Sequence, residues 1–156
     1  MSKPRRKYDP NRHARLLIDA KRRHEQANLE AIAAAPLTPA EITHFHNLSD
    51  VHTALIQRRK NISVSQDVLC FFAVLARNLA SFKQESPELC EAALTALQDS
   101  AQHAFNRGLD YLDLSTGQKK AINALNGFSQ RLIQHATRYQ FVEAYNHARQ
   151  VVIEMN

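Results

Sequence analysis

The sequence predicts an all-α protein, and three observations carry this prediction. The chain has 156 residues but only three glycines, fewer than the turns of a β-rich or doubly wound domain of this size would need. Five helix-start signals occur, each a capping residue followed by proline or by Glu or Gln three residues later. Apolar residues recur at helical spacing, and no segment alternates for long at period two. We therefore expect a bundle of about five helices.

The first helix is predicted over about 10–34, because Asp9 can cap it and Pro10 suits its first position. Before it, the chain has no apolar anchor beyond Tyr8. We expect residues 1–9 to form a flexible basic arm and residues 10–156 a single helical domain.

Two further helices follow capping boxes. The segment 38–41 (Thr-Pro-Ala-Glu) predicts a helix over about 39–59, and the segment 63–66 (Ser-Val-Ser-Gln) predicts one over about 64–84. The second of these helices carries an apolar stripe at 4-3-4-3 spacing, which predicts a buried face: Val68, Phe72, Leu75, Leu79 and Phe82.

Two helices complete the bundle. Ser86 and the proline after it predict a helix over about 87–113, with a break at Gly108. The segment 115–118 (Ser-Thr-Gly-Gln) starts the last and longest helix, over about 118–154.

The last helix is long for a compact domain, about 54 Å at 1.5 Å per residue. We expect it either to kink, near Gly127 or His135, or to project and offer a contact for a homodimer. Polar and aromatic residues near its end are expected to serve structure or an interface rather than catalysis: His135, Arg138, Tyr139 and Tyr145.

Several function classes find no support in the sequence. It has no secretory signal and no apolar run of about 18 residues, so a cytoplasmic protein with no membrane contact is expected. Cys70 and Cys90 lie in helical patterns and are expected to be buried, although a helix N-terminus could lower the pKa of Cys90. No nucleophile elbow, P-loop, dinucleotide fingerprint or zinc motif occurs, which predicts a non-enzyme without cofactors.

The histidines of the second helix predict no metal site. His44 and His46 are two residues apart and point about 200° away from each other on a helix. Glu41 and His44 resemble half of a bundle di-metal motif, but the chain has no second E-x-x-H.

Positive charge is concentrated at the N-terminus. Nine of the 20 Lys and Arg residues fall within the first 24 positions, where only Asp9 and Asp19 oppose them, giving +7. The other 132 residues hold eleven basic and thirteen acidic residues, giving −2. The nine cations are Lys3, Arg5, Arg6, Lys7, Arg12, Arg15, Lys21, Arg22 and Arg23.

Four of these arginines share one face of the first helix, within an arc of about 100°: Arg12, Arg15, Arg22 and Arg23. The opposite side carries Ala14, Leu17, Ile18 and Ile32 and is interrupted by polar residues. Asp19 lies inside the arginine arc, four residues from two arginines, which predicts i,i+4 salt bridges to Arg15 and Arg23.

Three interpretations of this basic segment remain open: a phosphate-binding surface for nucleic acid, a surface for an acidic protein or nucleoprotein, and a merely solvated face. Tyr8 could stack on a base. The Arg58-Arg59-Lys60 run either complements the dipole at a helix C-terminus or extends the positive surface.

The segment Arg5-Arg6-Lys7-Tyr8-Asp9-Pro10, followed by capped helices and a long final helix, resembles small helical proteins encoded by bacteriophages and prophages. That family has no assigned activity, so it supplies no site residues. The resemblance implies a host-directed or regulatory phage protein, for which inhibition of a CRISPR or similar defence complex is one role.

The sequence thus predicts a non-catalytic binding protein whose basic N-terminal segment engages nucleic acid or a nucleoprotein. The alternative is a protein–protein interaction or structural module that binds an acidic host or phage protein surface. The candidate binding residues are the nine N-terminal cations together with Tyr8, Arg58, Arg59 and Lys60.

Overall fold

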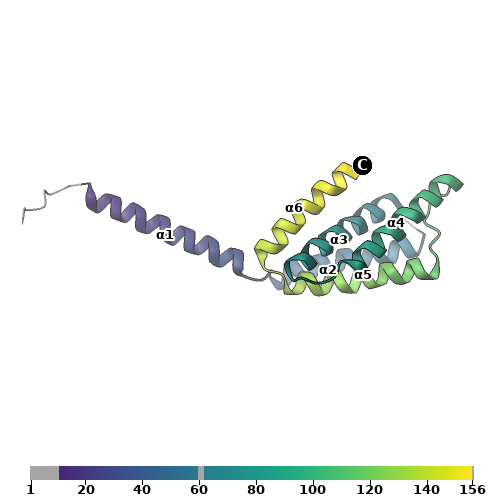
Figure 1. The fold of residues 1–156 in the computed structure, drawn as a ribbon, viewed down its shortest axis with the longest axis horizontal. Coiled ribbons are helices and arrows are strands. Elements are labelled where there is room, and N and C mark those ends of the chain that lie inside the picture. Colours follow the sequence, from purple (N-terminus) through teal and green to yellow (C-terminus); the bar gives the residue numbers. More distant parts are fainter. Residues whose placement is uncertain (1–10, 60–61, 156) are drawn as a thin grey trace, which may run out of the picture. The chain divides into compact units, whose positions relative to one another are not determined.

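The computed structural model describes residues 11–59 and 62–155, and within these ranges it contains six helices and no β-strand (Figure 1). The predicted all-α class is confirmed, with six helices where about five were expected. The helices are α1 (Arg12–Ala34), α2 (Pro39–Gln57), α3 (Ile62–Phe82), α4 (Glu88–Arg107), α5 (Thr116–His135) and α6 (Arg138–Met155).

The chain divides into two compact units, Met1–Ala35 and Pro36–Asn156. Helix α1 belongs to the first unit, and helices α2–α6 form the second, which we call the bundle unit. The expected division into an arm over 1–9 and one domain over 10–156 stays a prediction, since residues 1–10 lie outside the described part of the chain.

Helix α1 has no buried residue along its whole length. Its N-terminal neighbour Asn11 makes no side-chain capping hydrogen bond, and the cap expected at Asp9 and Pro10 lies outside the described residues. The helix ends where Ala35 turns extended (φ −69°, ψ 150°), because Pro36 disfavours a helical conformation in the residue before it.

Two of the predicted capping boxes are confirmed, and they set the starts of α2 and α5. The Glu41 amide donates to Thr38 Oγ1 (3.2 Å), while Glu41 Oε1 accepts from the Thr38 amide (3.2 Å). The Gln118 amide likewise donates to Ser115 Oγ (3.1 Å), and Gln118 Oε1 accepts from the Ser115 amide (2.9 Å). Each box satisfies two amides that the first helical turn leaves without a partner.

The start of α3 differs from the prediction, whereas the end of α4 lies at the expected break. Helix α3 begins at Ile62, so Ser63, the expected capping residue, lies inside the helix and not before it. Ser65, in the first turn, is buried, with its Oγ 3.0 Å from His52 Nδ1. The expected break at Gly108 is confirmed: helix α4 ends at Arg107, because Gly108 adopts a left-handed conformation (φ 64°) that closes the helix, and the chain does not return to a helix before residue 113. The chain after it returns to the core with Leu112 and Leu114 buried.

The predicted continuous helix over 118–154 is wrong: the chain breaks at Ala136 and Thr137 between α5 and α6. Thr137 forms a capping box, in which its Oγ1 accepts from the Gln140 amide (3.2 Å) and its amide donates to Gln140 Oε1 (3.2 Å). At the end of α5, the His135 carbonyl accepts from Lys83 Nζ (3.0 Å). The expected kink near His135 is therefore a complete break.

Helix α3 is the centre of the bundle unit and packs against α2, α4, α5 and α6. The predicted stripe supplies three fully buried side chains, Phe72, Leu75 and Leu79, whereas Phe82 at the end of the helix is exposed. In Figure 1, α6 runs at an angle to α2–α5, and it packs mainly against α3. This angle opens the cleft described below.

Candidate functional site

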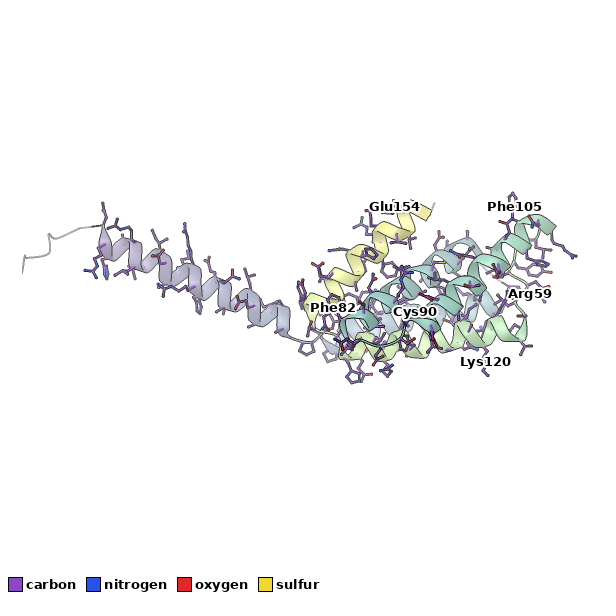
Figure 2. The ribbon with its side chains drawn as sticks, in the orientation of Figure 1. Arg59, Phe82, Cys90, Phe105, Lys120 and Glu154 are labelled. Carbon is purple, nitrogen blue, oxygen red and sulfur yellow. The ribbon has the colours of Figure 1, made fainter. Side chains whose placement is uncertain are left out.

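The arginine face of α1 is exposed along the helix. Side chains project from this helix all the way round in Figure 2. The side chains of Arg12, Arg22 and Arg23 form no hydrogen bond or ion pair with any other described residue. Their guanidinium groups therefore have all of their donors available for an external acceptor.

The salt bridges expected at Asp19 are not formed, since this carboxylate has no ion pair among residues 11–59 and 62–155. Helix α1 instead has an exposed pair between Lys21 Nζ and Glu25 Oε1 (4.0 Å). An exposed pair gains little Coulomb energy and costs side-chain entropy, so a spacing of four residues permits such a contact without enforcing it.

The cations at the end of α2 are divided between structure and solvent. Arg59 adopts a left-handed conformation (φ 61°) and donates to Asp113 Oδ1 (3.3 Å), with its guanidinium carbon 4.7 Å from the centre of the Tyr111 ring. Arg59 thus ties the end of α2 to the loop before α5. Arg58 is the exposed C-terminal capping residue of α2.

The remaining predicted site residues lie outside the described part of the chain. They are Lys60 and the cations and tyrosine of the N-terminal arm: Lys3, Arg5, Arg6, Lys7 and Tyr8.

The bundle unit has a second candidate surface, an apolar cleft of about 450 Å³ between α6 and the α2–α3 pair. Three aromatic rings line it, with the centroid of Tyr145 5.1 Å from that of Phe71 and 6.3 Å from that of Phe45. Asp67 and Arg149 are the charged residues of its lining, apart from His44. The lining as a whole consists of His44, Phe45, Leu48, Asp67, Val68, Phe71, Tyr145, Arg149, Val152 and Ile153. We call this surface the α6 cleft.

The polar and aromatic residues expected to group at the end of the last helix are separated. Tyr145 lines the α6 cleft, whereas the exposed Tyr139 lies near Phe82, with ring centroids 6.4 Å apart. Arg138 makes a two-pronged ion pair with Glu41, at 3.0 Å and 2.5 Å. Sequence spacing missed these partners because they come from α2 and α3.

The pair with Arg138 and the bonds from Thr38 lower the pKa of Glu41 to about 2. The same carboxylate accepts the hydrogen bonds that cap α2 and forms the ion pair with Arg138, the first residue of α6. Because its oxygens are engaged in this way, Glu41 does not act as half of a di-metal motif with His44.

A polar network between α2 and α5 was not predicted. Asp50 Oδ1 accepts from Asn126 Nδ2 (2.8 Å) and Gln130 Nε2 (2.6 Å), and Ser49 Oγ donates to Asn126 Oδ1 (2.5 Å). His46 Nε2 lies 3.1 Å from the Gln130 carbonyl oxygen. These side chains satisfy one another and fix the register of the two helices.

The described residues contain no assembled metal site, and both cysteine thiols are buried. No group of three or more His, Cys, Asp or Glu side chains there is placed to hold a metal ion. Cys70 and Cys90 are buried, and this burial raises the pKa of each thiol to about 11. A lowered pKa at Cys90 was therefore a wrong expectation, because desolvation outweighs the lowering effect of the Arg77 charge.

No family model, curated protein or solved structure matches this chain. The resemblance to phage-encoded helical proteins accordingly stays a prediction. Among the described residues, no helix is long and apolar enough to cross a membrane.

Proposed function

We propose that this chain is a non-catalytic binding protein whose basic N-terminal segment engages the phosphate backbone of a nucleic acid, alone or within a nucleoprotein. The observation that supports this proposal is the surface of α1. No residue of this helix is buried, and the side chains of Arg12, Arg22 and Arg23 have no partner among the described residues. A planar guanidinium with free donors suits the paired oxygens of a phosphate.

The dimensions of the helix fit this role. Its 23 residues span about 35 Å at 1.5 Å per residue, close to one turn of duplex DNA. Contacts of this kind position a protein on a nucleic acid without reading its sequence. Occupation of a host nucleoprotein would make the protein a regulator or inhibitor of that complex, such as a defence complex.

The α6 cleft favours a second candidate function, a protein–protein interaction module that acts without nucleic acid. Its lining is mainly apolar and aromatic, and exposed apolar surface of this kind is typical of interaction sites. In this alternative, the arginine face of α1 binds an acidic host or phage protein surface by the same charge complementarity.

The salt dependence of binding tests the first proposal. Fluorescence anisotropy with labelled duplex and single-stranded oligonucleotides is measured between 50 and 200 mM salt. If about five cations contact phosphates, the log–log slope is expected near −4 to −5 on duplex DNA. A flat salt dependence, or no binding at the lowest salt, contradicts the proposal.

A pair of charge-reversed variants locates the surface. Arg22→Glu with Arg23→Glu should reduce oligonucleotide affinity at least tenfold. Lys119→Glu with Lys120→Glu makes the same change in net charge at exposed positions of α5 and should leave affinity within about twofold. Equal losses in the two variants would mean that overall charge, and not α1, is responsible. Capture from a nuclease-treated host lysate separates the alternative, because a direct protein partner is retained and a nucleoprotein held through its nucleic acid is lost.

A further inference from the structure

The side of α1 opposite its arginine face carries a line of residues at 4-3-4-3-4 spacing: Ala14, Ile18, Lys21, Glu25, Asn28 and Ile32. Leu17 and Leu29 flank this line, and these two leucines and both isoleucines are more than half exposed. A spacing that alternates three and four residues is that of the seam between two paired helices.

A helix of this length gains most of its stability from packing, and not from its backbone alone. The N-terminal unit contains no second helix among its described residues that could cover this line. Within the described part of the N-terminal unit, this line is therefore left exposed.

The charged residues of this line are complementary to themselves when the line is reversed about residue 23. In an antiparallel pair centred there, Lys21 of each helix faces Glu25 of the other, Ile18 faces Asn28, and Ala14 faces Ile32. A parallel pair would instead place Lys21 against Lys21 and Glu25 against Glu25, and like charges in a seam repel.

The charges of the two halves of the helix follow the same rule. Residues 12–23 hold five cations and one carboxylate, whereas residues 24–34 hold two carboxylates and no Lys or Arg. Antiparallel pairing sets each basic half beside the acidic half of the other helix. Two independent features thus favour the antiparallel orientation: the charge pairing within the seam, and the opposite net charges of the two halves of the helix.

From this complementarity we infer that α1 pairs with α1 of a second copy of the chain, antiparallel and centred on residue 23. The contact is isologous, so both copies use the same surface. The arginine face points away from the seam and stays exposed on both copies. The inference does not rest on the proposed binding of nucleic acid, and it is tested without nucleic acid present.

Sedimentation of the full-length protein at low salt tests the pairing. We expect wild-type dimers, and a dissociation constant at least tenfold weaker for Lys21→Glu and for Glu25→Lys, because each variant puts like charges in the seam. An equimolar mixture of the two variants should form a heterodimer close to wild-type affinity, since each Glu of one chain then faces a Lys of the other. A monomeric wild type, or a mixture that associates no better than its components, would overturn the inference.

The mixture also controls for helix stability. Each single variant loses the pair between residues 21 and 25 within its own helix, and mixing cannot restore that pair. Recovery on mixing therefore reports contact between chains.

Disulfide trapping tests the orientation. A mixture of Ala14→Cys and Ile32→Cys chains should cross-link readily, because these positions face each other in the antiparallel pair. Ala14→Cys alone should not, because its two copies would lie about 27 Å apart along the pair. Efficient cross-linking of Ala14→Cys with itself would show a parallel pair and contradict the inference.

Discussion

Deletion of residues 1–35 should leave the bundle unit folded and nearly as stable as in the full chain. Every side chain of the buried core comes from residue 37 or later, so the deletion removes none of them. We expect a change of less than about 1 kcal/mol in the free energy of unfolding, the range typical of surface changes.

The alternative arrangement predicts a very different value. If the four large apolar side chains of α1, Leu17, Ile18, Leu29 and Ile32, were packed on the bundle, each would contribute about 1.5–3 kcal/mol. Their combined loss of roughly 6–12 kcal/mol would equal much or all of the stability of an ordinary domain.

Two measurements on the deletion variant decide between these outcomes. Thermal unfolding followed by circular dichroism should give a Tm within about 3 °C of the full chain. The deletion also removes nine basic and four acidic residues, which leaves eleven of each and takes the formal net charge from +5 to 0. The variant should therefore pass through a cation-exchange column that retains the full chain at pH 7. An unfolded variant, or a Tm lowered by 10 °C or more, would refute the reasoning.

Three further outcomes are expected in the bundle unit. Phe72→Ala, at a fully buried position of α3, should cost about 3–5 kcal/mol in urea unfolding, whereas Phe105→Ala, at a side chain 82% exposed, should change little. Glu41→Gln should destabilise the protein at pH 6 but hardly at all near pH 2. The folded-state pKa of about 2 lies below the ordinary 4.5, so this stabilisation is present above pH 4.5 and is lost as the pH falls toward 2. Thr137→Ala should cost about 1 kcal/mol through the lost cap of α6, while Thr137→Ser should retain most of it.

Each of these outcomes can fail separately. Equal losses for the two phenylalanine variants would contradict the assigned core. A Glu41→Gln deficit that is the same at pH 6 and pH 2 would show that the ion pair is not its source. Full stability of Thr137→Ala would show that α6 does not depend on its cap.

Short sequence motifs predicted the start of a helix correctly where a capping residue and a Glu or Gln three positions later set the first turn. The boxes at Thr38 and Ser115 could be read directly, because capping depends on residues three positions apart. The box at Thr137 has the same form but was not predicted. An apolar stripe continues from Leu132 through Ala136 to Tyr139, and this stripe predicts one continuous helix. Periodicity reports which face is apolar, but it does not report whether the backbone is continuous.

The candidate surfaces were unequally accessible to sequence analysis. The arginine face of α1 depends on a single helix, so its arrangement follows from spacing alone. The α6 cleft depends on the angle at which α6 crosses α3, and no local pattern encodes that angle. Likewise, the spacing around Glu41 pointed to His44, whereas its ion-pair partner Arg138 lies 97 positions along the chain.

The junction between α5 and α6 has a mechanical consequence. Pro36, the first residue of the bundle unit, pairs with Thr137 in an isolated antiparallel β-bridge. The residue after Thr137, Arg138, forms the ion pair with Glu41. Tension on the segment that leads into the bundle is therefore transmitted first to the root of α6. Because α6 forms one wall of the cleft, a pull on the N-terminal unit would act on the cleft through this anchor, ahead of the deep core around Phe72.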